Sequence, residues 1–196
     1  MSPAVPDSSP LVCLASESPR RRELLAQLGV PHLVQPADLD ESRSANEPAA
    51  DYVVRVARAK ALAVRARGVQ LPVLAADTAV VLGDAVFGKP RDRAEGVGML
   101  ARLAGRSHRV LTAVALAHAA GVAFRLSASE VRMRAISEAE CAAYWDSGEP
   151  HDKAGGYAIQ GRGAVFVEHL SGSYSGVVGL PLFETAQLLH AAGVPL

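Results

Sequence analysis

Short apolar runs alternate with helical patterns of apolar residues along most of the chain. The runs Leu11–Ala15 and His32–Pro36 predict two short strands. Between them, leucines at helical spacing predict a helix that begins at Pro19, where a missing N–H costs nothing, and stops at Gly29. A strand followed by a polar turn and a helix presents free backbone N–H groups at the helix start. The beginning of the chain therefore predicts a place where an anion is favoured.

The rest of the chain continues this alternation. Capping pairs, apolar spacing and glycines predict helices at Pro48–Arg67, Asp92–Leu103 and Ser137–Gly148. Apolar or alternating runs predict strands at Pro72–Leu82, Ala85–Phe87, His108–His118 and Val122–Arg134. Beyond residue 150, glycine-rich loops separate three expected strands and a last helix, at Tyr157–Gln160, Ala164–Leu170, Ser175–Val178 and Pro181–Ala192. Together these elements predict a single α/β domain with a mixed twisted sheet flanked by helices.

Composition and charge narrow the class of protein. The 196 residues are 49% hydrophobic, with 20 Lys and Arg against 20 Asp and Glu, which fits one domain with a sizeable core. A net charge of zero gives no overall field to hold a polyanion, so we expect no nucleic-acid polymer as a partner. No apolar run approaches the ~20 residues that span a bilayer, so we expect no membrane partner either.

The cysteines and the N-terminal segment indicate a cytoplasmic protein. Cys13 and Cys141 lie far apart in apolar surroundings, which indicates reduced, buried thiols rather than a disulfide framework. The small, polar, proline-rich segment Met1–Pro10 lacks the basic and apolar regions of a signal peptide. We expect residues 1–10 to form a disordered tail and residues 11–196 to form the domain.

The turn at Ser16–Arg22 is the first candidate for chemistry. It places hydroxyl groups, N–H groups and three guanidinium groups at the start of a helix, a combination that suits a phosphate. Basic residues there oppose the helix dipole, so the arrangement is unfavourable unless an anion binds. The alternative is a basic first turn that is simply solvated.

A carboxylate in the middle of an apolar strand is the second candidate. Asp77 needs a partner, a metal or an opening, because burying an unpaired charge is costly. Asp40 and Glu41, in the polar stretch after the second strand, would add hard oxygen ligands for Mg²⁺ or Mn²⁺. The alternatives are an irregular strand end for Asp77 and solvated loop positions for the other two.

Lysine is scarce, and its three positions are informative. Of the 20 basic residues only Lys60, Lys89 and Lys153 are lysines, so we ask what a compact ammonium group does at each. Lys153 opens a glycine-rich segment, residues 152–161, where the backbone either approaches a ligand closely or forms a flexible loop. The sequence motifs of P-loop, dinucleotide-binding and serine-esterase sites are absent.

Four segments together resemble the Maf family of nucleotide pyrophosphatases. They are LASESPRRRELLAQLGV at 14–30, AADTAVV at 75–81, GKPRD at 88–92, and DKAGGYAIQGRGAVFVEHLSGSYSGVVGLPLFET at 152–185. The likeness extends over nearly the whole chain from Leu11 onward. It implies an α/β fold similar to that of the inosine triphosphate pyrophosphatases, with a deep cleft. It also implies metal-dependent hydrolysis of a nucleoside triphosphate to the monophosphate and diphosphate.

The resemblance also implies a role for each candidate residue. Asp77 is expected to be the catalytic base, which takes the proton of a water that attacks the α-phosphorus. Glu41 is expected to bind Mg²⁺ or Mn²⁺, and Asp77 is expected to join it. The other implied cleft residues are Lys60 and Lys89 for catalysis and Ser16, Arg20, Arg21 and Lys153 for substrate binding. The ammonium groups of the three lysines would neutralise the charge that develops on the diphosphate leaving group.

Three positions bear on the choice of base. The set Arg20, Thr78 and Gln160 resembles the branch of the family that acts on dTTP and UTP. The branch that acts on 7-methyl-GTP carries Trp, Gln and Glu at the matching places. The Gln160 amide offers both a donor and an acceptor to the edge of a pyrimidine. Glu17 stands at the variable position between two serines and adds a negative charge beside the expected phosphate site.

The sequence thus predicts a cytoplasmic enzyme that clears unwanted nucleotides from the nucleotide pool. Two alternatives remain open at this point: a nucleotide-binding regulator of septum formation and cell division, and a pyrophosphatase of broader or purine specificity. Similar proteins are usually homodimers, so a second copy of the chain is a candidate partner.

Overall fold

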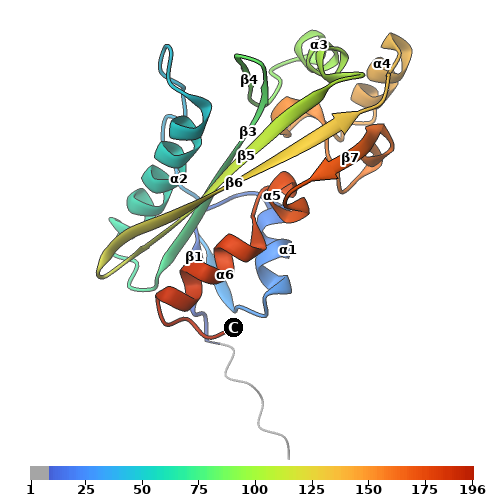
Figure 1. Cartoon of the computed structure of the whole chain (residues 1–196). Helices are drawn as coiled ribbons and strands as arrows, with labels where there is room; N and C mark the ends of the chain where they lie inside the picture. Colours follow the sequence, from blue (N-terminus) through green and yellow to red (C-terminus); the bar gives the residue numbers. More distant parts are fainter. Residues whose placement is uncertain (1–8) are drawn as a thin grey trace, which may run out of the picture.

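A seven-stranded mixed sheet forms the centre of the described part of the protein (Figure 1). The computed structural model describes residues 9–196, so most of the tail predicted at 1–10 lies outside the described residues. The strands are β1 (Val12–Leu14), β2 (His32–Val34), β3 (Val73–Leu82), β4 (Ala85–Phe87), β5 (Ser107–His118), β6 (Gly121–Met133) and β7 (Val167–Ser171). Their order is β2-β1-β3-β5-β6-β7, and β4 pairs with β3. The β1 strand is parallel to both of its neighbours, and all other pairs are antiparallel.

Helices cover both faces of this sheet. They are α1 (Pro19–Gln27), α2 (Ala49–Arg65), α3 (Arg93–Leu103), α4 (Glu138–Asp146), α5 (Tyr174–Val178) and α6 (Leu182–Ala191), with the 3-10 helices η1 (Ala154–Gly156) and η2 (Arg162–Phe166). The α2 helix packs on one face, and α1 and α6 pack on the other. The α3 and α4 helices gather at one end of the sheet (Figure 1).

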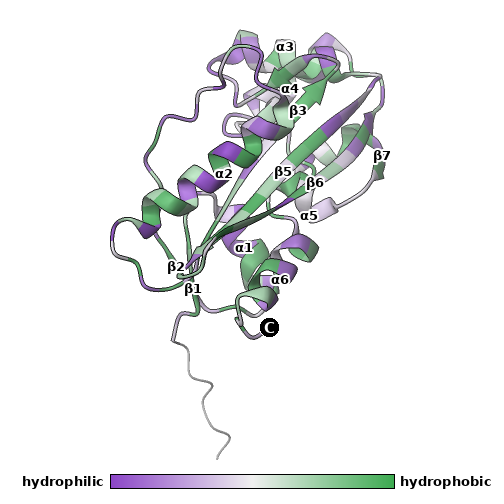
Figure 2. Ribbon diagram, turned by 60° about the vertical axis from the view of Figure 1, so that its left-hand side comes forward, coloured by the Kyte–Doolittle hydropathy of each residue, from purple (hydrophilic) through white to green (hydrophobic). Residues whose placement is uncertain are grey.

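Alternation along β3 explains how one strand serves two cores. Val73 and Ala75 pack toward α2, whereas Leu74 and Ala76 pack toward α1 and α6, because successive strand side chains point to opposite faces. The α2 helix is correspondingly hydrophobic toward the sheet and polar on its outer side (Figure 2). Both faces of the first half of β3 are therefore buried, and a charged side chain on this strand needs a partner.

The predicted class, a single α/β domain around a mixed sheet, is confirmed. Strands and helices as far as residue 148 form close to their predicted bounds. Both cysteines are free and buried, as expected. Among residues 9–196, no helix is both long enough and apolar enough to cross a membrane.

The predictions for the glycine-rich C-terminal part are partly wrong. Residues Tyr157–Gln160 form no strand, because the chain turns at Gly155 and Gly156, whose φ angles are 72° and 68°. Residues Ser175–Val178 belong to α5, because the Ser173 hydroxyl accepts a hydrogen bond from the N–H of Gly176 (2.9 Å) and so caps a helix there.

The segment predicted as a strand at Ala164–Leu170 divides into two elements. Its first part lies in η2, where Ala164 N–H donates to the carbonyl of Gly161 (3.1 Å). Pairing with β6 begins only at Val167. The apolar run is thus shared between a helical turn and an edge strand, which periodicity alone does not separate.

Candidate active site

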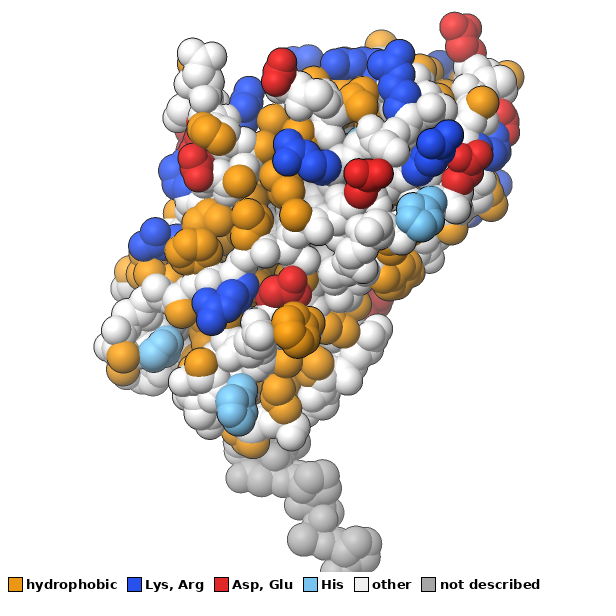
Figure 3. All heavy atoms as spheres, in the orientation of Figure 1, with side chains coloured by type: hydrophobic (Ala, Val, Ile, Leu, Met, Phe, Trp, Pro, Cys, Tyr) orange, Lys and Arg blue, Asp and Glu red, His pale blue; other side chains and the backbone are white. Residues whose placement is uncertain are grey.

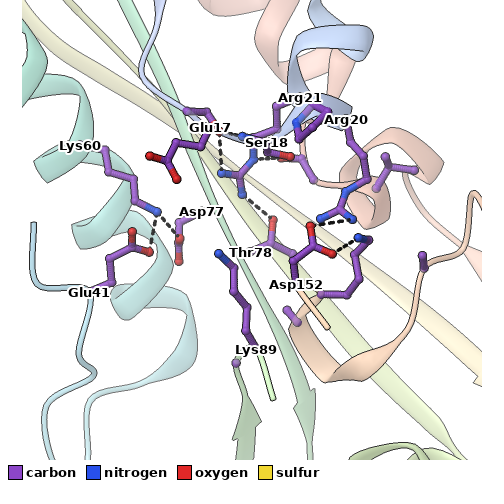
Figure 4. A pocket seen from close by; sticks show the side chains of 18 of the residues that line it. Glu17, Ser18, Arg20, Arg21, Glu41, Lys60, Asp77, Thr78, Lys89 and Asp152 are labelled. Atoms are coloured by element: carbon purple, nitrogen blue, oxygen red, sulfur yellow. Dashed lines mark hydrogen bonds and ion pairs between the residues drawn. The ribbon is translucent and has the colours of Figure 1, made fainter. Parts of the chain in front are cut away.

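A cleft of about 860 Å³ opens where the end of β1, the middle of β3, α2 and the residue 152–160 segment meet. Ten of the residues that the sequence singled out for a site role lie in its wall: Ser16, Arg20, Arg21, Glu41, Lys60, Asp77, Thr78, Lys89, Lys153 and Gln160. Figure 4 shows most of these side chains directed into one space. The three lysines, which come from distant segments, therefore share one cleft.

Asp77 lies in the interior of the sheet at the centre of this cleft. It pairs with Ala113 of β5, and its residue surface is only 6% exposed. One carboxylate oxygen, Oδ1, accepts a hydrogen bond from Lys60 Nζ (2.9 Å), whereas the buried Oδ2 has no partner. Burial raises the pKa of Asp77 above its ordinary value, although Lys60 and Arg21 oppose the shift. Because no donor occupies Oδ2, this oxygen can accept a proton.

Lys60 joins two carboxylates. Its Nζ donates to Glu41 Oε2 (2.6 Å) as well as to Asp77 Oδ1 (2.9 Å), so one ammonium group bridges the loop before α2 to strand β3. This bridge was missed at the sequence level. A signal for it exists, because Lys60 falls on the apolar stripe of α2 between Val56 and Val64, where a lysine is buried and must find an anionic partner.

The carboxylates fit a divalent cation in part. Asp77 Oδ2 is buried and unpartnered, and carboxylate oxygens are the ligands that Mg²⁺ and Mn²⁺ prefer. Asp40, the third acidic candidate, does not line the cleft, and its Oδ1 accepts from the N–H of Ser42 (2.8 Å). Within residues 9–196 no group of three His, Cys, Asp or Glu residues is arranged to hold a metal. Glu41 and Asp77 would therefore share the cation with water or phosphate oxygens.

Arg21 forms the floor of the cleft and ties three segments together. Its Nε donates to the carbonyl of Gly179 (2.8 Å), its Nη2 to Thr78 Oγ1 (3.3 Å) and its Nη1 to Ser16 Oγ (3.5 Å). The Thr78 hydroxyl is in turn within 3.0 Å of the Thr112 hydroxyl. Burial lowers the pKa of Arg21, although Asp77 opposes the shift. Arg21 is thus fixed before any ligand arrives.

Arg20, Lys153 and Lys89 stand at the other side of the cleft. Arg20 and Lys153 both pair with Asp152, the former at 3.8 Å. Lys89 follows β4 and extends into the space between Asp77 and Asp152 (Figure 4). These side chains place three cationic groups around a volume that can hold a polyphosphate.

The cleft is not simply basic. Among residues 9–196 its wall carries five cationic and five acidic side chains, namely Arg20, Arg21, Lys60, Lys89 and Lys153 against Glu17, Asp38, Glu41, Asp77 and Asp152. Glu17 turns its carboxylate toward the Lys60 side of the cleft (Figure 4). On the outer face shown in Figure 3, basic and acidic side chains are likewise interspersed. A highly charged anion would thus enter most favourably together with a cation.

A buried histidine supports the wall of the cleft. His108 is 3% exposed, and its Nε2 lies 2.8 Å from the hydroxyl of Tyr157, a residue of the cleft wall. Its ring contacts the ring of Tyr157 edge to face. Burial lowers its pKa from 6.5 to about 4.

This shift predicts a loss of stability in acid. The unfolded state binds a proton at His108 below pH 6.5, whereas the folded state binds it only near pH 4, so stability falls as pH drops between these values. The wild type should lose about 3 kcal/mol more than His108→Gln between pH 7 and pH 4 in urea unfolding. The exposed His169→Gln serves as the control, and it should follow the wild type. Parallel curves for wild type and His108→Gln would contradict the assignment.

Fold and site together define an α/β protein with a preformed cleft, lined by basic and acidic side chains, and a buried carboxylate at its centre. Residues 11–192 match the family model described as Maf-like protein. The chain belongs to the Maf family.

Two named relatives match the chain over nearly its full length. It is 53% identical over 194 residues to a protein named dTTP/UTP pyrophosphatase from Saccharophagus degradans, covering 97% of this chain and 92% of the relative. It is 51% identical over 199 residues to a protein of the same name from Bordetella avium, covering 97% and 99%. The solved structure of the Staphylococcus aureus Ham1 protein overlaps with a TM-score of 0.42 and 12% identity, over 62% of this chain and 71% of the other.

Proposed function

We propose that this protein is a nucleoside triphosphate pyrophosphatase that hydrolyses dTTP and UTP to the monophosphate and diphosphate. The observation that carries the proposal is the buried Asp77 carboxylate, with one free oxygen, at the centre of a cleft with lysines from three segments. The names of the close relatives supply the substrate class. We place the reaction in the cytoplasm.

Asp77 acts as the general base. Its free Oδ2 takes the proton of the water that attacks the α-phosphorus, while Lys60 holds Oδ1 and so fixes the carboxylate plane. A pKa raised by burial makes the carboxylate a better proton acceptor than one in water. Lys89 and Lys153 stabilise the negative charge that develops on the departing diphosphate.

A divalent cation, Mg²⁺ or Mn²⁺, completes the site in this proposal. Glu41 would hold it beside Asp77, whose free oxygen stays available to the water, and the equal numbers of acidic and basic side chains in the cleft favour a substrate that brings a cation with it. When bound, such a cation withdraws charge from phosphate oxygens and lowers the pKa of its water. The side chains of the cleft then need only orient the substrate and accept one proton.

The base is read at the outer end of the cleft. Gln160 is exposed there, and its amide offers a donor and an acceptor that match the edge of uracil or thymine. Thr78 is engaged with Arg21 and Thr112, so its contribution is to hold the floor on which the nucleotide lies. Arg20 pairs with Asp152 in the cleft wall and binds the phosphates from there.

The base preference is tested by ranking nucleotides. With Mg²⁺ or Mn²⁺ present, kcat/KM for UTP and dTTP should exceed that for CTP, ITP and 7-methyl-GTP by at least about tenfold, because a site built to pair a base edge rejects a mismatched one. Diphosphate release should stop when the cation is chelated and resume when it is restored. A higher value for a purine nucleotide would overturn the base assignment.

A further inference from the structure

Gln160 stands in a turn between η1 and η2 and belongs to no strand or helix. Its side chain is exposed, and neither neighbour lies in the sheet. An amide that discriminates between bases must be held in place, because a misplacement of about 1 Å forfeits most of the gain from orientation. The structure must therefore fix this turn by other means.

The carboxylate of Glu149 holds the chain after Gln160. Its Oε2 accepts a hydrogen bond from the N–H of Arg162 (2.9 Å), and its Oε1 accepts one from the N–H of Gly163 (3.0 Å). Both donors lie within three residues of Gln160. One side chain thus satisfies two successive backbone groups of the turn.

Tyr144 of α4 extends the same network to the chain before Gln160. Its hydroxyl donates to Glu149 Oε1 (2.6 Å) and accepts from the N–H of Ala158 (3.0 Å). Tyr144 is 5% exposed and packs edge-to-face on Phe166, so it has little freedom to move. The turn is consequently held on both sides of Gln160 by one connected pair of side chains.

Glycines make this close approach possible. A Cβ atom at Gly161 would stand 2.4 Å from Glu149 Oε2, and one at Gly163 would stand 2.7 Å from Tyr144 Oη. At either position a Cβ atom would force a neighbour to move, so the backbone lies close against the pair.

The network also keeps Glu149 ionised. Burial alone would raise the pKa of its carboxyl, but the hydrogen bonds from Tyr144, Arg162 and Gly163 outweigh burial and lower it. A charged carboxylate binds the N–H groups more strongly than a neutral one.

We propose that Glu149, acting with Tyr144, is a positioning residue that sets base selectivity by fixing the turn that carries Gln160. The inference rests on the proposed function, because it takes Gln160 as the group that reads the base. Neither Glu149 nor Tyr144 lines the cleft, so neither touches the substrate.

The test compares Glu149→Gln with the wild type in kcat/KM for UTP and for CTP. The UTP to CTP ratio should fall about tenfold, mainly through a higher KM for UTP, because the turn loses one anchor while the phosphate site is unchanged. Hydrogen exchange of the backbone amides in residues 158–163 should become faster, a readout that needs no activity. Glu168→Gln is the matched control, since Glu168 is an exposed residue of β7 that pairs with Arg132 of β6, away from the turn.

Tyr144→Phe provides the second variant if Glu149→Gln does not fold. It keeps the ring and removes only the hydroxyl, and it should shift the ratio in the same direction. A UTP to CTP ratio within about twofold of the wild type in a folded variant would overturn the inference, because a purely structural role lowers both kcat/KM values together. A wild type without preference for UTP would instead refute the proposed function, and the exchange experiment would still test the positioning.

Discussion

Replacing Asp77 by asparagine is expected to lower the kcat for UTP hydrolysis about a thousandfold while the protein stays folded. Asparagine has the same shape, and its carbonyl oxygen still accepts the hydrogen bond from Lys60. It cannot accept the proton of the attacking water, so general-base catalysis is lost. Diphosphate release at saturating UTP measures the effect.

A matched control separates the chemistry from the loss of a charge. Asp84→Asn changes the same side chain in the exposed turn between β3 and β4, outside the cleft. It should retain wild-type kcat. If Asp77→Asn kept a tenth of the activity or more, the general base would have to be another group.

Replacing Lys60 by methionine should weaken both the fold and the reaction. Lys60 is 7% exposed and bridges Asp77 and Glu41, so methionine leaves the carboxylate of Asp77 buried without its ion-pair partner. Removing one partner of a buried pair is expected to cost about 3 kcal/mol of unfolding free energy. Loss of the group that orients the base should lower kcat by a further factor of about 10². Urea unfolding and diphosphate release measure the two effects separately.

Arg58→Met is the control for this variant, because Arg58 lies on the exposed outer side of the same helix, over the ring of Phe124. It should change stability by well under about 1 kcal/mol and leave kcat unaltered. A Lys60→Met protein as stable and active as Arg58→Met would show that the bridge does not hold the carboxylate for reaction.

The sequence predicts which residues form the site, but it does not predict most of the contacts between them. Asp77 marks the cleft because it is a carboxylate within an apolar strand, and the lysines mark it because they are scarce in a chain that otherwise uses arginine. The Lys60 bridge was missed, although the apolar stripe of α2 contains its signal. The support of Gln160 by Glu149 left no signal, because it depends on a turn that brings residues 149 and 162 together.

The fold shows the same division. Elements with strong periodicity, such as β3 and α2, formed where they were expected, because burial on a sheet decides them. The C-terminal strands were mispredicted where glycines and side-chain caps, rather than periodicity, direct the backbone. Gly155 turns the chain just before one predicted strand, and Ser173 starts a helix just before another; apolar content alone suggested strands there.

The charge balance of the cleft links its two proposed ligands. Acidic and basic side chains there are equal in number, so a triphosphate meets little net attraction by itself. A divalent cation bound by Glu41 and Asp77 would shift the balance toward the substrate. The zero net charge of the whole chain is thus repeated at the site.

Hydrolysis of UTP in water enriched in heavy oxygen tests the central claim most directly. After a single turnover the products are separated and their masses are determined by mass spectrometry. If Asp77 activates a water that attacks the α-phosphorus, the label enters UMP and the diphosphate carries none. Label in the diphosphate, or orthophosphate as the first product, would contradict this mechanism.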